Sequence, residues 1–172
     1  MTLFETKAPA IMILLMKDFD LDDQQAAAIL GNLGHESGGF KFLQEKKPLV
    51  PGSKGGYGWA QWTGPRRRSY EAYCKKNSLD PTSDKANYGF LFVELKGSEK
   101  ASISALKAAE GFRNQVIAFE KKFERAGVKH YNNRVQWAEK ALKAYKANPP
   151  IVETPKTWSF INWLMSLFTG KK

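Results

Sequence analysis

Glu36 is the residue whose type and position in this sequence most strongly suggest chemistry. It stands seven positions after Ile29 and three after Leu33, in a stretch whose apolar residues repeat with helical spacing. Seven residues fall about 20° short of two full helical turns, so Glu36 continues the apolar stripe of its helix. Burying an ionised carboxylate is costly, and the carbonyl end of a helix also disfavours negative charge. We therefore expect a carboxyl group that holds its proton and can act as a general acid.

A structural ion pair with an arginine or a lysine is the alternative for Glu36. The neighbouring residues argue for chemistry instead. Residues 34–40 read Gly-His-Glu-Ser-Gly-Gly-Phe, and residues 56–62 read Gly-Tyr-Gly-Trp-Ala-Gln-Trp. These motifs, together with Phe-Glu-Arg-Ala-Gly at 123–127, resemble the phage tail-type lysozyme family, which is related to goose-type lysozymes and lytic transglycosylases. Trp59 stands where the family commonly has an aliphatic residue, which is a mild departure.

The resemblance implies a role for several residues of the first two motifs. Glu36 would be the general acid that protonates the leaving oxygen of a glycosidic bond. Ser37 and Gln61 would hydrogen-bond this acid or the acetamido group of the sugar. Three aromatic side chains would offer flat faces to the apolar C–H surface of sugar rings: Tyr57, Trp59 and Trp62. Core packing is the alternative for each ring alone, whereas their clustering beside Gln61 favours a cleft wall.

A second catalytic carboxylate is harder to place. Hydrolysis by the two-carboxylate route needs one, and aspartates flank the glutamine segment in goose-type enzymes. Here residues 52–56 and 63–65 contain no carboxylate, and Glu45 is the only acidic residue between Glu36 and Gln61. Glu45 either positions water or, beside two lysines, is a solvated loop residue. Hydrolysis and substrate-assisted transglycosylation, which leaves 1,6-anhydro products, are both open routes.

The elements that must position these residues are predicted to be helices, because the aliphatic residues gather in helix-spaced clusters. Asp20 or Asp22 is expected to cap the helix that ends at Glu36, and its small residues Gly31 and Gly34 would let another backbone approach closely. The expected helices cover residues 8–19, 23–36, 65–77, 84–96, 99–110, 112–126 and 133–148.

The composition limits the protein's partners and compartment. Its 27 basic and 17 acidic residues give a formal charge of +10, which suggests either an anionic partner or simply solubility. Cys74 is the only cysteine, so no intrachain disulfide can form, as suits folding in a reducing cytoplasm. We expect Cys74 to be a small buried hydrophobe. The apolar run at 8–16 lacks a cleavage site and is read as a buried first helix.

The sequence also contains features of two other classes of protein. His35 and Glu36 could begin a zinc-peptidase motif, but Gly39 stands where the second histidine would be, so we expect neither metal nor cofactor. The rival from another class is a basic nucleic-acid-binding protein, suggested by three arginines at 66–68 with Tyr70 and Tyr73 nearby. Consecutive arginines spread around a helix, however, so a solvated face or attraction to envelope polymers is favoured over nucleic acid.

These arguments predict a mainly α, lysozyme-like catalytic domain over residues 1–148, with a small β-hairpin or an extended cleft wall. The expected activity is that of a muramidase, a single-domain endolysin that cleaves the β-1,4 bond between N-acetylmuramic acid and N-acetylglucosamine. Its partner would be bacterial peptidoglycan, and the chain would act as a monomer. We expect synthesis in the host cytoplasm and action on the wall in the periplasm.

Residues 149–172 are expected to form a linker and an amphipathic, cationic tail. Its apolar residues Trp158, Phe160, Ile161, Trp163, Leu164 and Phe168 surround a narrow polar stripe, and lysines lie on both sides. At about 1.5 Å per residue such a helix is too short to cross a bilayer. Docking on the domain is the alternative to binding an anionic outer membrane or lipopolysaccharide.

The membrane hypothesis is tested by deleting residues 155–172. We expect the truncated protein to digest purified peptidoglycan as before, because the deleted residues lie outside the predicted catalytic domain. Its killing of intact Gram-negative cells should fall. Unchanged killing in a colony-count assay would remove the membrane role of the tail.

Overall fold

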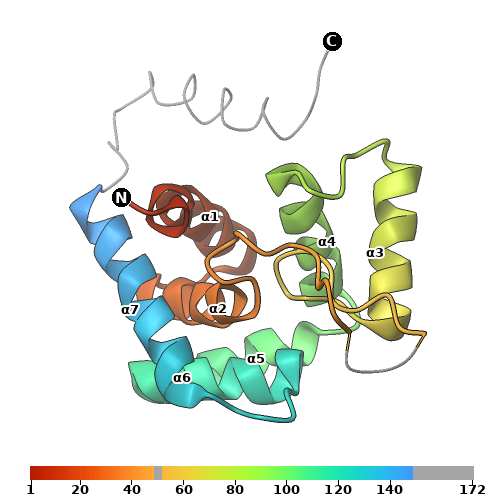
Figure 1. The fold of residues 1–172 in the computed structure, drawn as a ribbon. Coiled ribbons are helices and arrows are strands. Elements are labelled where there is room, and N and C mark those ends of the chain that lie inside the picture. The colour runs from red at the N-terminus through yellow and green to blue at the C-terminus, as the bar shows by residue number, and fades with distance from the viewer. Residues whose placement is uncertain (49–51, 149–172) are drawn as a thin grey trace.

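The computed structural model describes residues 1–48 and 52–148, and it confirms a mainly helical fold (Figure 1). Within these residues the chain forms seven α-helices and one short π-helical turn. They are α1 (Leu3–Phe19), α2 (Asp23–Glu36), α3 (Gly64–Lys76), α4 (Asp84–Lys96), α5 (Lys100–Ala108), α6 (Phe112–Phe119), the π-helical turn η1 (Glu120–Glu124) and α7 (Tyr131–Ala147).

Two capping boxes set the starts of the first two helices. Thr2 caps α1 and exchanges hydrogen bonds with Glu5, so this helix begins earlier than the apolar run at 8–19 predicts. Asp22 caps α2 in the same way with Gln25, whereas Asp20 closes α1 in a left-handed conformation. Of the two predicted candidates, Asp22 is therefore the N-cap of α2. The α2 boundaries match the predicted 23–36 and place Glu36 at the last helical residue.

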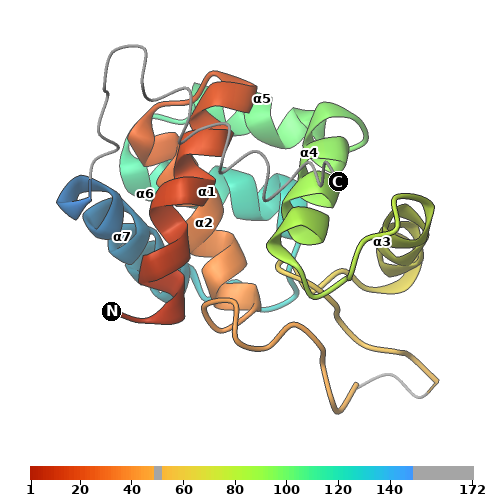
Figure 2. The same cartoon turned by 90° about the horizontal axis from the view of Figure 1, so that it is seen from above.

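Helix α2 packs against α7, α6 and α1 (Figures 1 and 2). Its residues from Ala26 to Gly34 are all buried. A Cβ added at Gly31 would lie 2.5 Å from Ala138 Cβ and 2.5 Å from the Arg134 carbonyl oxygen. One added at Gly34 would meet the Phe4 ring at 2.8 Å. The predicted close approach of another backbone is therefore confirmed at Gly31, where α7 packs against α2, whereas side chains of Phe4 and Trp137 fill the space at Gly34.

An extended segment connects α2 to α3, and helices α3 and α4 lie together on the opposite side of the molecule from α7 (Figure 1). Tyr57 forms isolated antiparallel bridges with Gln44 and with Trp62. No strand forms among the described residues. Of the two predicted alternatives, a small β-hairpin and an extended wall, the segment therefore corresponds to the extended wall. Arg67 of α3 secures the wall by donating to the carbonyls of Lys54 and Gly55 and to the Gln44 side chain.

The predicted tail, including Trp158, Phe160, Ile161, Trp163, Leu164 and Phe168, lies outside the described residues. Its membrane role therefore stays a prediction. Among residues 1–48 and 52–148, no helix has both the length and the apolar character needed to cross a membrane.

Candidate active site

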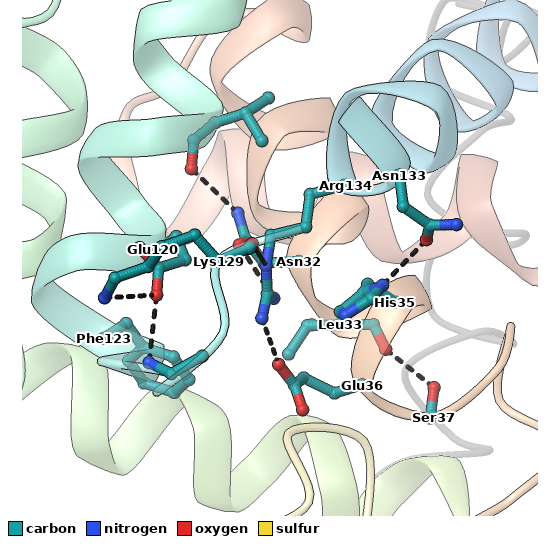
Figure 3. A network of polar contacts seen from close by, with 12 residues as sticks. Asn32, Leu33, His35, Glu36, Ser37, Glu120, Phe123, Lys129, Asn133 and Arg134 are labelled. Atoms are coloured by element: carbon teal, nitrogen blue, oxygen red, sulfur yellow. Dashed lines mark hydrogen bonds and ion pairs between the residues drawn. The ribbon is translucent and has the colours of Figure 1, made fainter. Parts of the chain in front are cut away.

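Glu36 is partly exposed at the C-terminal end of α2, with 21% of its side chain accessible. Its Oε1 lies 2.6 Å from Nη2 of Arg134, which reaches it from the first turns of α7 (Figure 3). The structure therefore contains the ion pair with an arginine that is the structural alternative for Glu36. A charge-assisted hydrogen bond of this length fixes the position of the carboxyl group while part of its surface stays open to solvent.

Arg134 is almost entirely buried, with a side chain only 1% exposed. Its Nε donates to the carbonyl of Lys129 at 3.0 Å, and its Nη1 donates to Oδ1 of Asn32 at 3.2 Å. The buried Asn32 amide donates in turn to the carbonyl of Val116 on α6 at 3.1 Å. Arg134 and Asn32 together thus connect α2, α6 and α7 beside the carboxyl group of Glu36, as Figure 3 shows.

Ser37 is buried in the turn that follows Glu36. It is fully buried, its Oγ donates to the carbonyl of Leu33 at 2.7 Å, and the same oxygen accepts from the Phe40 amide at 2.9 Å. Gly38, Gly39 and Phe40 then follow with positive φ angles, which glycine adopts readily and phenylalanine rarely. Ser37 therefore stabilises the turn after Glu36, and this burial leaves no surface for contact with a sugar.

The side chain of Gln61 holds its segment against the loop that follows Glu36 by donating to backbone carbonyls. Its Nε2 donates to the carbonyls of Phe42 at 2.9 Å and of Gly58 at 3.0 Å. Phe42 also donates its amide to the carbonyl of Ser37, again at 2.9 Å. One residue, Phe42, therefore joins the Gln61 segment to the residue after Glu36. Gln61 has a φ of 45°, a strained conformation of the kind that gathers at functional sites.

The three aromatic residues of the 56–62 motif differ in accessibility. Trp59 and Trp62 are buried at 0% and 1% exposure, so they pack in the core and present no ring face to a ligand. Trp62 also donates its indole N–H to Glu94 at 2.7 Å. Tyr57 is half-buried, with its ring against Tyr70. The sequence could not show this difference, because the spacing of aromatics in an irregular segment does not reveal which of them face inward.

Phe42 is an exposed aromatic residue that the sequence analysis did not select. Its side chain is exposed at 67%, and its ring packs over the backbone at Gly38. It lies in the loop that connects Glu36 with Gln61. No spacing rule indicates it, although it stands only three residues after Gly39.

Glu45 braces the extended wall. Its Oε2 accepts from the Gly56 amide at 2.9 Å, and its own amide donates to the Gly56 carbonyl at 2.9 Å. The side chain is thus engaged with the loop backbone, which accounts for its partial burial beside two exposed lysines.

The arginine run of α3 is largely engaged in internal contacts. Arg66 forms a bidentate pair with Glu94 through two bonds of 2.8 Å, and its guanidinium lies 4.4 Å from the ring centre of Phe123. Arg67 is buried against the wall and paired with Glu71 at 2.9 Å. Only Arg68 of the three is exposed, so the run forms no continuous basic surface.

Glu124, the last residue of the π-helical turn η1, has a buried carboxyl oxygen, Oε1, without a hydrogen-bond partner among the described residues. Burial is the main cause that raises its pKa well above the usual range, and the negative charge of Glu36 raises it further. Arg66 and Arg134 act in the opposite direction, and Glu94 adds to the increase. The sequence showed Glu124 within the Phe-Glu-Arg-Ala-Gly motif, but nothing in its spacing from Glu36 indicates an electrostatic interaction between the two residues.

Among the described residues, no group of three or more His, Cys, Asp or Glu side chains is arranged to hold a metal ion. His35 is engaged differently, through a 2.7 Å contact of Nδ1 with Oδ1 of Asn133 and through packing of its ring near His130.

A helical domain that fixes a partly exposed carboxyl group at a helix end, beside a glutamine-bearing wall, is the arrangement of a lysozyme-like enzyme. The phage tail lysozyme family matches residues 6–145, and the chain belongs to this family. No curated protein and no solved structure matches the chain. Family membership indicates a lytic enzyme that acts on the bacterial cell wall.

Proposed function

We propose that the protein is a muramidase that cleaves the β-1,4 bond between N-acetylmuramic acid and N-acetylglucosamine, with Glu36 as the general acid. The observation that carries this proposal is the position of Glu36, partly exposed at a helix end and held by a buried arginine. A general acid must be fixed within hydrogen-bonding reach of the leaving oxygen, and this contact network provides the required rigidity.

The Arg134 contact also has a place in the reaction. Glu36 carries a proton when it donates to the glycosidic oxygen, and it becomes a carboxylate as the C–O bond breaks. The Arg134 guanidinium, 2.6 Å from Oε1, stabilises the negative charge that develops at this moment. The resulting carboxylate can then accept the proton of the attacking group.

Transglycosylation is the second candidate reaction, because Glu45 is bound to the Gly56 amide and does not stand as a free carboxylate beside Gln61. In hydrolysis the attacking group is water, whereas in transglycosylation it is the C6 hydroxyl of the muramic acid. Glu36 serves as acid and then as base in both. The products differ, with reducing ends in the first case and 1,6-anhydro ends in the second.

The engagement of Arg66 and Arg67 argues against the nucleic-acid-binding alternative, because neither guanidinium is available to phosphates.

We propose that the protein acts as a monomer on peptidoglycan in the periplasm after synthesis in the host cytoplasm, and that its chemistry needs no cofactor. The net positive charge assists its approach to the anionic wall.

Replacing Glu36 with glutamine tests the proposed function. Glutamine keeps the size of the side chain but has no acidic proton, so we expect cleavage of purified peptidoglycan to fall by about 10²–10⁴-fold. Mass spectrometry of the wild-type products then distinguishes reducing-end from 1,6-anhydro muropeptides. A Glu36→Gln protein that cleaves as fast as the wild type would exclude Glu36 from the mechanism.

A matched pair of aromatic substitutions tests which rings contact the sugar. We propose that the exposed Phe42 offers the platform, so Phe42→Ala should weaken binding of an N-acetylglucosamine oligomer about ten-fold, with little change in stability. Trp62→Phe should instead lower the free energy of unfolding by about 2 kcal/mol, because the bond to Glu94 is lost, and leave oligomer affinity unchanged. Titration calorimetry and thermal unfolding separate the two effects. Wild-type affinity in Phe42→Ala would contradict the platform.

A further inference from the structure

A small cavity lies beside the turn that follows Glu36, and the proposed reaction has no use for it. Its volume is about 80 Å³, and it lies where the start of α1 meets α7 and the segment 38–41 (Figure 2). One water molecule needs about 10–15 Å³, so the cavity has room for a group of several heavy atoms. The side chains that line it indicate which group that is.

One side of the cavity is aromatic. The Phe4 ring lies edge-on to Trp137 with the ring centres 4.8 Å apart, and Trp137 is half-buried. The Gly39 backbone packs against the same indole, because a Cβ added at this glycine would lie 2.7 Å from the ring. All three residues line the cavity. Its aromatic side is therefore fixed by packing and offers an apolar surface to a short aliphatic chain.

The other side carries charges of both signs. Glu5 comes from α1, Lys41 from the segment after α2 and Lys140 from α7. Oε2 of Glu5 accepts from the amide of Thr2 at 2.7 Å and from its hydroxyl at 3.0 Å, and these bonds lower the pKa of Glu5, so the carboxylate is charged. Nζ of Lys140 lies 4.5 Å from the ring centre of Trp137. Within the described parts of the chain neither Lys140 nor Lys41 forms a salt bridge, so both ammonium groups are available to a ligand.

We propose that this cavity binds the peptide stem of muramic acid, at a stem residue that carries an ammonium group beside a carboxylate, as meso-diaminopimelate does. Lys41 and Lys140 pair with the carboxylate, and Glu5 accepts from the ammonium group. The methylene chain of the same residue lies against Trp137.

The mixed charges favour this occupant over a simple anion. A phosphate or an isolated carboxylate would be attracted by the two lysines but repelled by Glu5. An amino-acid end with both charges meets an opposite charge on each side, and such complementarity gives specificity. The cavity therefore distinguishes stems with meso-diaminopimelate from stems with L-lysine, which have the side-chain ammonium group but no carboxylate beside it.

The position of the cavity suits a stem that branches from a sugar at the proposed site. Gly38 lines the cavity, and the Phe42 ring packs over the same glycine. Gly38 is also only two residues after Glu36. The stem is attached to muramic acid through the C3 oxygen, so it extends away from the sugar ring. The inference rests on the proposed function, because it assumes that this sugar binds at Phe42 and Glu36.

Titration calorimetry with the tripeptide L-Ala-γ-D-Glu-meso-diaminopimelate tests the inference without a catalytic step. We expect the wild type to bind it about five-fold more tightly than the analogue with L-lysine as third residue. Lys41→Gln and Lys140→Gln should each reduce this preference to about two-fold, because each removes one partner of the carboxylate. Equal affinity of the wild type for the two tripeptides, or no binding of either, would overturn the inference.

Lys143→Gln is the matched control. Lys143 is an exposed lysine three residues further along α7, and it does not line the cavity. The substitution removes the same charge from the protein, so we expect the preference of the wild type to remain. A loss as large as that of Lys140→Gln would mean that general attraction to a cationic surface explains the binding, which also overturns the inference.

Nitrogen-15 NMR of the full-length protein locates the bound tripeptide. The Gly39 amide and the Trp137 indole N–H should shift during the titration, and shifts confined to other parts of the protein would contradict the assignment. The proposed function can fail separately. If Glu36→Gln cleaves peptidoglycan like the wild type, the proposed function fails, while the tripeptide titrations still decide the role of the cavity. If Glu36→Gln is inactive and the wild type shows no preference between the tripeptides, only the role of the cavity fails.

Discussion

The contact between the buried Arg134 guanidinium and the Glu36 carboxyl group is the interaction on which the rest of the structure depends. A buried guanidinium is stable only when its donors are paired, and breaking such a pair typically costs about 3–5 kcal/mol. Arg134 satisfies this requirement with Glu36, Asn32 and the Lys129 carbonyl. Helices α2 and α7 can approach closely enough for these contacts because Gly31 leaves room for the α7 backbone.

The Arg134–Glu36 contact is one of two sets of contacts that position the residues of the site. The network fixes Glu36 from the side of α7, while Phe42 links the Glu36 turn to Gln61 in the extended wall. Ser37, Trp59 and Trp62 are buried and support these two parts from within. The charge of Glu36 is thus balanced from the interior by the buried Arg134.

The sequence predicted the local features of this arrangement better than the distant ones. The ends of α2, the close approach at Gly31 and the position of Glu36 follow from capping residues, glycine and helical spacing, which act over a few residues. Arg134 lies 98 positions from Glu36, and no periodicity connects them. The burial of Trp59 and Trp62 could not be predicted from the sequence either, because an irregular segment has no fixed alternation of inner and outer faces.

Arg134→Met tests the central claim most directly, since methionine fills much of the same buried space without a charge or donors. The rate of peptidoglycan cleavage is measured at a temperature where circular dichroism shows the variant to be folded. If Arg134 fixes the acid in place, the rate per folded molecule should fall by about 10²-fold, because a small misplacement of a reacting group costs this much. A folded variant that cleaves at the wild-type rate would contradict the account.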